Sequence, residues 1–259
     1  EHKLPEFTWK TGPVTIGANL ATIALPEEYR FLESKQARVV LEEIWGNPKD
    51  PDVLGLMFPP NQGPETENGW AVVVSWDDSG YVKDDDARSI NYDDLLKQMQ
   101  EETREANKAR KKQGYPTVDL LGWAEQPHYD ATKKTLYWAK RLKFDGTEEP
   151  QLNYNMRVLG RRGVLELNPL GAESVLSKIR EAAPVLLSAT TFTQGNRYED
   201  FSESSGDKVA AYGIAGLLGV GLLAKAGILK LLLKPLIIVG AIIVGVVGKI
   251  MGGRKNNAS

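Results

Sequence analysis

Residues 151–167 read QLNYNMRVL (151–159), GRRG (160–163) and VLEL (164–167). The alternation in the first part gives a strand an apolar face of Leu152, Tyr154, Met156 and Val158 and a polar face of Asn153, Asn155 and Arg157. Such a period of two is typical of a strand with one face in water. The GRRG segment has the length and glycine content of a hairpin turn. The stretch therefore predicts two antiparallel strands within a sheet.

Strand and helix patterns continue on both sides of this hairpin. Further apolar or β-branched runs predict strands over 14–16, 20–25, 53–58, 70–76, 118–123 and 135–144. Helical spacing of apolar residues predicts helices from Ser34, from Asn91 and over 172–183, and Pro184 is expected to end or restart the last one. Because tight turns join successive strands, we expect an α+β fold, mainly an antiparallel sheet with packed helices.

The composition of the chain divides at residue 209. After residue 208 there are six basic residues and no acidic one, and the net charge of the whole chain is −2, so residues 1–208 carry −8. An acidic head is unlike a nucleic-acid binder, which needs a basic face against phosphate. The chain has no cysteine, which excludes disulfides, thiolate nucleophiles and cysteine-based zinc sites.

The C-terminal part predicts a helical membrane segment. We divide the chain into a head (1–192), a linker (193–208), a membrane segment (209–251) with apolar blocks 209–224 and 235–251, and a basic polar tail (252–259). A spanning helix needs about 20 apolar residues, so each block is slightly short and one or two crossings remain open. Just before them, Tyr198 and Phe201 are candidates for the membrane interface.

Small residues recur every four positions in both blocks, at Ala211, Ala215, Gly219, Ala241 and Gly245. This spacing lets helices approach closely in lipid, which predicts a homo-oligomer or a tight hairpin. The commonness of Gly and Ala in membrane helices explains it equally well. Contact with lipid headgroups is expected for the basic side chains Lys225, Lys230, Lys234, Arg254 and Lys255.

Candidate catalytic and metal sites are weak. His128 with Asp130 suggests a base and its orienting carboxylate, but no Gly-x-Ser-x-Gly elbow supplies a nucleophile, and Asp130 suits a turn better. The acidic runs 84–86 and 93–94 do not have the spacing of a calcium loop. The turn 160–163 could hold a phosphate or a lipid headgroup, although a plain turn with two exposed arginines is favoured. We assign no catalytic residue, metal or cofactor.

Several motifs together resemble a known family. They are Trp123, Pro127-His128-Tyr129-Asp130, Leu136-Tyr137-Trp138-Ala139, Asn153-Tyr154, Leu159-Gly160-Arg161-Arg162-Gly163, Gly195-Asn196-Arg197-Tyr198 and Asp207-Lys208-Val209-Ala210-Ala211-Tyr212-Gly213. The chain is similar to the bacterial family catalogued as domain of unknown function 2167. The resemblance implies an exported head in the periplasm of a Gram-negative cell and a C-terminal anchor in the inner membrane, and it implies no activity. The order of elements also resembles the α-β-α sandwich of Mog1 and PsbP-like proteins.

Three functions follow as hypotheses. The first is a non-enzymatic, membrane-anchored periplasmic binding or scaffold protein that self-associates through its C-terminal helices. It would have membrane lipids and possibly another membrane or periplasmic protein as partners. The second is a pore-forming or bilayer-remodelling oligomer with a regulatory head. The third is a hydrolase that uses His128.

Overall fold

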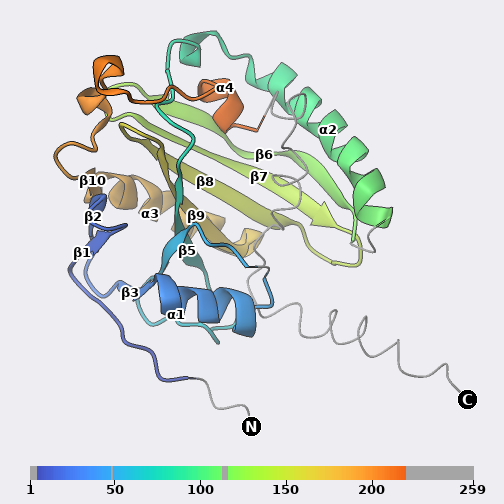
Figure 1. Ribbon diagram of the computed structural model, residues 1–259. Helices are drawn as coiled ribbons and strands as arrows, with labels where there is room; N and C mark the ends of the chain where they lie inside the picture. Colours follow the sequence, from blue (N-terminus) through green and yellow to red (C-terminus); the bar gives the residue numbers. More distant parts are fainter. Residues whose placement is uncertain (1–4, 48, 113–115, 220–259) are drawn as a thin grey trace, which may run out of the picture.

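The centre of the computed structural model, which describes residues 5–47, 49–112 and 116–219, is a seven-stranded antiparallel sheet (Figure 1). Its strand order is β3 (Arg30–Glu33), β4 (Val53–Phe58), β5 (Ala71–Asp77), β9 (Val164–Ala172), β8 (Gln151–Leu159), β7 (Thr135–Phe144) and β6 (Val118–Asp130). The predicted hairpin is confirmed, because β8 and β9 pair antiparallel with Leu159 opposite Val164. The expected α+β class is also confirmed.

Both glycines of the turn 160–163 are required by close contacts. A Cβ atom on Gly163 would lie 2.1 Å from the backbone oxygen of Asp77, and one on Gly160 would lie 2.6 Å from the ring of Phe192. A backbone oxygen cannot yield as the end of a flexible side chain does. The turn therefore packs against Asp77 at the end of β5 on one side and against Phe192 on the other.

A second, smaller sheet and one helix cover the first face of the large sheet. The small sheet consists of β1 (Pro13–Ile16), β2 (Ala21–Ala24) and β10 (Thr190–Phe192), and the helix is α3 (Leu176–Ala189). The expected stop at Pro184 is wrong, since α3 continues past it. Leu186 and Leu187 beyond the proline are buried in the core, and this burial offsets the lost backbone hydrogen bond.

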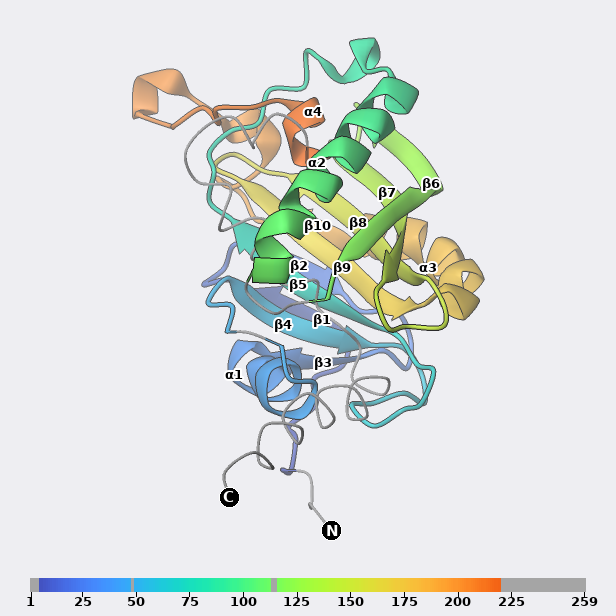
Figure 2. The same cartoon turned by 90° about the vertical axis from the view of Figure 1, so that its right-hand side faces the viewer.

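Two helical segments cover the second face, at opposite ends of the sheet (Figure 2). α1 (Ser34–Arg38), continued by a π-helical turn (Val39–Ile44), packs on β4, whereas α2 (Tyr92–Lys112) packs on β6. The expected water-facing side of β8 is therefore wrong. Asn155 and Arg157 are each only 7% exposed, and they are hydrogen-bonded to each other and to neighbours on the same face.

The segment that follows β10 is part of the domain. The expected linker 193–208 instead forms two short 3₁₀ turns, Tyr198–Asp200 and Glu203–Ser205. Tyr198 and Phe201 were candidates for a membrane interface, but Tyr198 is buried and both rings pack against Tyr81. Their burial within the domain removes them from that role.

The first apolar block also begins inside the domain. Val209 forms a parallel bridge with Tyr81, and α4 (Ile214–Leu217) follows. Ile214 and Leu218 are at most 1% exposed, and burial of such side chains contributes about 1.5–3 kcal/mol each. The division expected at residue 209 is therefore wrong, because residues 209–219 belong to the head.

Within the described part of the chain, no helix is long and apolar enough to cross a membrane. The remaining residues of the two apolar blocks and the basic tail, including Ala241, Gly245, Lys225, Lys230, Lys234, Arg254 and Lys255, lie outside the described residues.

Replacing Gly163 by alanine tests the close contact at the turn. We expect Gly163→Ala to lower the free energy of unfolding by about 1–3 kcal/mol, as overpacking does in a rigid interior. Gly63→Ala is the matched control, because the nearest atom to its added Cβ is a flexible arginine nitrogen at 3.8 Å. Urea unfolding followed by tryptophan fluorescence measures both, and equal stability of the two variants would contradict the packing argument.

Candidate functional site

A groove of about 400 Å³ lies between α3 and the loop that joins β4 to β5. Its lining is mainly apolar and comes from well-separated parts of the chain: Pro26, Tyr29, Pro59, Pro60, Gln62, Trp70, Lys178, Glu181, Ala182, Val185 and Leu186. Tyr29 and Trp70 meet edge to face, with ring centroids 6.4 Å apart. Three prolines, two aromatic rings and aliphatic side chains form a surface suited to an apolar ligand.

Hydrogen bonds hold the loop wall of the groove in place. Gln62 accepts a bond from the backbone N–H of Trp70 (2.7 Å) through its side chain and a bond from Arg30 Nη2 (2.6 Å) through its backbone oxygen. The indole of Trp45 donates to the backbone oxygen of Pro64 at 2.9 Å. These bonds fix the conformation of the loop wall, and a fixed wall lowers the entropy cost of binding.

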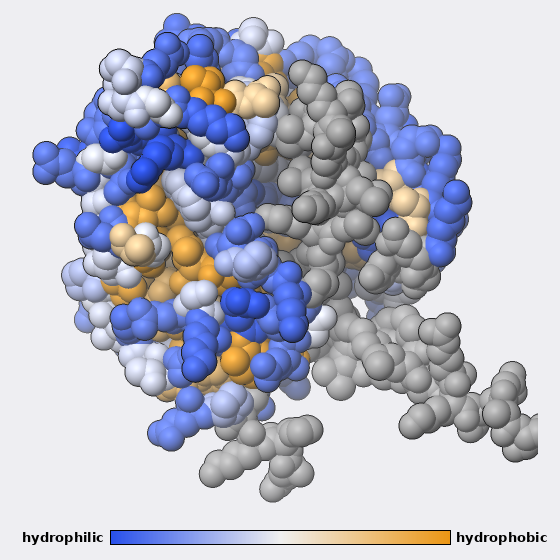
Figure 3. All heavy atoms as spheres, in the orientation of Figure 1, coloured by the Kyte–Doolittle hydropathy of each residue, from blue (hydrophilic) through white to orange (hydrophobic). Residues whose placement is uncertain are grey.

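The α3 wall of the groove carries an exposed apolar side chain. Val185 is 51% exposed, and among the described residues it and Leu121 are the two large apolar side chains that lie exposed. On the face drawn in Figure 3, polar residues predominate and apolar residues form several patches among them. Lys178 and Glu181 add one charge of each sign to the lining. Burial raises the pKa of Tyr29, so its phenol stays protonated at neutral pH.

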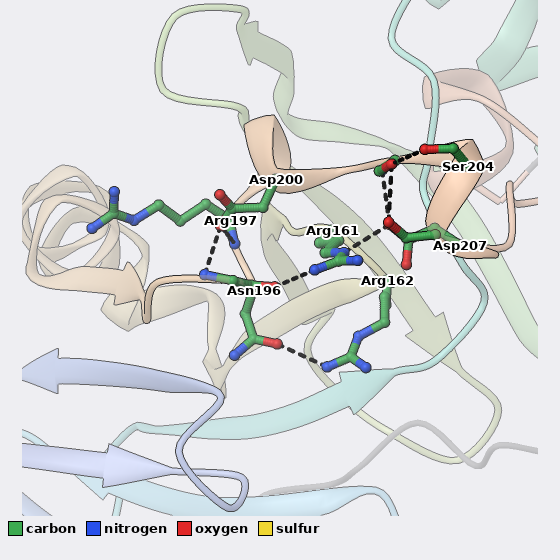
Figure 4. A network of polar contacts seen from close by, with 10 residues as sticks. Arg161, Arg162, Asn196, Arg197, Asp200, Ser204 and Asp207 are labelled. Atoms are coloured by element: carbon green, nitrogen blue, oxygen red, sulfur yellow. Dashed lines mark hydrogen bonds and ion pairs between the residues drawn. The ribbon is translucent and has the colours of Figure 1, made fainter.

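The turn 160–163 has a structural role, because its first arginine bonds to residues of the segment 193–208 (Figure 4). Arg161 Nε lies 2.7 Å from Asp207 Oδ2, and its Nη1 donates to the backbone oxygen of Gly195 at 3.2 Å. The same Asp207 oxygen accepts a bond from the backbone N–H of Ser202 at 2.8 Å. The hydrogen bond from Arg161 is the main cause of a lowered pKa of Asp207.

The second arginine of the turn remains on the surface. Arg162 is exposed and donates to Asn196 Oδ1 at 2.9 Å. Asp200 accepts bonds from the backbone N–H groups of Gly195 and Arg197 at 2.8 and 2.9 Å, whereas the Arg197 guanidinium points away from the cluster (Figure 4). The expected pair of exposed arginines is therefore wrong for Arg161 and right for Arg162.

Two aspartates of the acidic run 84–86 accept hydrogen bonds from other parts of the domain. Asp84 accepts bonds from Tyr129 (2.7 Å), Lys134 (2.8 Å) and Tyr198 (3.1 Å). Burial raises the pKa of Asp84, but these hydrogen bonds outweigh it and the net pKa is lowered. Asp86 accepts the backbone N–H groups of Ile214 and Ala215, at the start of α4. Among the described residues, no cluster of acidic or histidine side chains is suited to hold a metal ion.

His128 lies on β6, exposed, with its ring 5.1 Å from that of Tyr137. Asp130 accepts bonds from the backbone N–H groups of Thr132 and Lys133 and so forms the turn between β6 and β7. Its expected role as a turn residue is confirmed. Among the described residues, no serine is hydrogen-bonded to His128 or Asp130.

The small residues of the first apolar block do not share a helix face. α4 comprises only Ile214–Leu217, so it includes Ala215 but neither Ala211 nor Gly219. Gly219 has a φ of +102°, which ends the helix. The expected four-residue stripe on one helix is therefore wrong for these three residues.

Comparison with known proteins assigns the chain to a family. It belongs to the family described as "Protein of unknown function (DUF2167)", whose model matches residues 8–248. A search of curated proteins found no match.

Two solved structures are similar in fold. The cyanobacterial PsbP (CyanoP) of Synechocystis sp. PCC 6803 is 9% identical over 74% of this chain and 95% of its own, with a TM-score of 0.37. The Ran-binding protein Mog1p of Saccharomyces cerevisiae is 7% identical over 76% of this chain and 100% of its own, with a TM-score of 0.39.

The lowered pKa of Asp207 predicts how its stabilising contact with Arg161 responds to acid. Because the folded-state pKa lies below the unfolded value of about 3.9, the pair with Arg161 stabilises the fold above that pH, and this contribution is lost as the pH falls through the folded pKa. We expect Asp207→Asn to be less stable than the unaltered protein at pH 7, and the difference to shrink steadily as the pH falls below about 4. Asp78→Asn, at an exposed turn, is the control. A stability difference that does not change with pH would contradict this.

Proposed function

We propose that this protein is a non-enzymatic binding module, held at the bacterial inner membrane with its head in the periplasm. The head binds an extended apolar segment of another membrane or periplasmic protein in the groove between α3 and the β4–β5 loop. The preformed wall of prolines and aromatic rings beside the exposed Val185 is the observation that carries this proposal.

The chemistry of the groove favours a peptide over a reactive small molecule. Proline and aromatic side chains form rigid apolar walls of the kind that bind extended segments in other recognition domains. Lys178 and Glu181 supply one charge of each sign, which suits the polar backbone and flanking charges of a peptide. The exposed Val185 supplies apolar area that a partner covers.

The sequence beyond Gly219 supports a single main membrane segment. With residues 209–219 folded into the head, residues 220–233 give at most fourteen positions before Lys234, and Lys225 and Lys230 interrupt them. A spanning helix needs about 20 residues, so the block 235–251 with its flanks is the better candidate to cross. We assign Lys225, Lys230, Lys234, Arg254 and Lys255 to contacts with lipid headgroups.

Self-association is then assigned to the second block. Ala241 and Gly245 keep the four-residue spacing that allows two helices to pack closely in lipid. A homo-oligomer formed there would present several grooves at one membrane surface, and such multivalency raises the apparent affinity for a repeated partner.

Photo-cross-linking in living cells tests whether the groove binds a partner. We expect a photoreactive side chain at position 185 to give a discrete adduct, and the same group at position 121, the other exposed apolar position, to give none. A synthetic copy of the cross-linked partner segment is then titrated by calorimetry. We expect Val185→Asp to weaken its binding about tenfold or more, and Leu121→Asp to leave it unchanged. Equal binding by both variants would remove the groove from the proposal.

Mass measurement in detergent tests self-association. We expect the full chain to be oligomeric and the double variant Ala241→Leu, Gly245→Leu to shift towards the monomer, because the added side chains separate the helices. Val246→Leu is the control within the same block. A strict monomer for the unaltered chain would refute self-association and leave the groove proposal standing.

A further inference from the structure

On the second face of the sheet, α1 covers one end and α2 the other (Figure 2). The registers of the strands between them place a strip of polar side chains on this face. It runs over four adjacent strands and consists of Ser75, Trp138, Lys140, Asn153, Asn155, Arg157, Glu166 and Asn168. This strip faces away from the groove, since alternate residues of β8, among them Tyr154 and Met156, belong to the core under α3 and the small sheet. It is therefore a separate site.

Arg157 is at the centre of the strip and most of its donors are already used. Its Nε lies 3.2 Å from Glu166, its Nη1 donates to Asn168 (2.7 Å) and to the backbone oxygen of Met156 (2.9 Å), and its Nη2 donates to Asn155 (3.2 Å). Arginine has five N–H donors, so these contacts leave one on Nη2 without a partner among the described residues. Glu166 also accepts a bond from Ser75, at 3.1 Å, and its charge is balanced by Arg157.

Two further donors on the same face lack partners. Trp138 is 2% exposed, its ring lies 5.1 Å from the Arg157 guanidinium, and its indole Nε1 is buried with no hydrogen-bond partner. A buried unpaired donor costs about 1–3 kcal/mol, so it requires an explanation. Lys140 follows two residues later on β7, half-buried, and its Nζ makes no hydrogen bond or ion pair to any residue the structure describes.

The charges and donors of the strip define the ligand that fits it. Arg157 and Glu166 neutralise each other, so Lys140 leaves one unbalanced positive charge. The unused groups are all donors, and an ionised carboxylate is an acceptor with a single negative charge. The flanking amide side chains of Asn153 and Asn168 can bond to hydroxyl or amide groups next to that carboxylate.

We propose that the strip is a binding site for a small carboxylate that carries hydroxyl or amide groups, with Lys140 balancing its charge and Trp138 and Arg157 donating to its oxygens. Burial lowers the pKa of Lys140 to about 8, and the charge of Arg157 acts in the same direction. The charged lysine is therefore unfavourable in the empty protein and is stabilised by an anion.

The test uses the full chain in detergent and N-acetylalanine as the probe. We expect saturable binding by calorimetry together with a shift of the Trp138 indole N–H signal in NMR spectra. N-acetylalaninamide, in which an uncharged carboxamide replaces the carboxylate, should show neither the binding nor the shift of the indole signal. Lys140→Met should weaken binding about tenfold or more, the loss expected for a hydrogen bond to a charged group. Lys140→Arg should retain it.

Lys133→Met is the matched control, because it removes the same charge at an exposed turn. Lys140→Met should also raise the melting temperature of the ligand-free protein, whereas Lys133→Met should not. Tighter binding of inorganic phosphate than of the carboxylate would overturn the assignment. Unchanged binding in Lys140→Met, or no binding of any of these anions, would overturn the site itself while leaving the groove proposal untouched.

Discussion

Strands β8 and β9 lie in the middle of the large sheet with most side chains on both faces buried, and the rest of the molecule depends on this double burial. On one face the apolar side chains of β8 pack under α3 and the small sheet. On the other face its polar side chains are buried between the segments covered by α1 and α2. A buried polar group is costly unless it is bonded, so Asn155, Arg157 and Glu166 satisfy one another. The donors left over by this network distinguish the strip from a purely structural one.

The same requirement explains why the chain continues past β10 before it leaves the domain. Residues 193–219 add Tyr198, Ile214 and Leu218 to the core beneath α2. Acidic residues hold this segment at separate points: Asp207 through Arg161, and Asp86 through the start of α4. These bonds attach residues 193–219 directly to the turn of the central hairpin and to the loop before α2. They leave no flexible spacer in residues 193–208.

The sequence predicts the hairpin and most of the elements because local patterns determine them. The alternation in β8 and the glycines at 160 and 163 are sufficient for the turn and the pairing. The short strands β3 and β10 escape prediction, because four and three residues are too few to show a period and they form only by pairing with β4 and β2. Pro184 misleads because tertiary burial outweighs a local preference.

The sites are harder to predict than the fold. The groove combines residues near 26, 60, 70 and 182, and no local pattern links them. The polar side of β8 reads as water-facing, since a strand pattern does not reveal that its polar side chains bond to one another and are buried. The apolar residues 209–219 read as membrane, because burial in protein and burial in lipid select the same side chains.

The two candidate sites lie on opposite faces of one sheet, so any coupling between them passes through the strands that they share. Neighbouring residues of β8 belong to different faces, so Tyr154 lies under α3 and Asn155 lies in the polar strip. A ligand that orders the strip also restricts the backbone of β8, and α3 packs on that strand. Coupling requires that one ligand distinguish two states of the sheet. Continuous antiparallel pairing on both sides of β8 and β9 argues against two such states, so we expect the proposed carboxylate to change the affinity for the proposed peptide little.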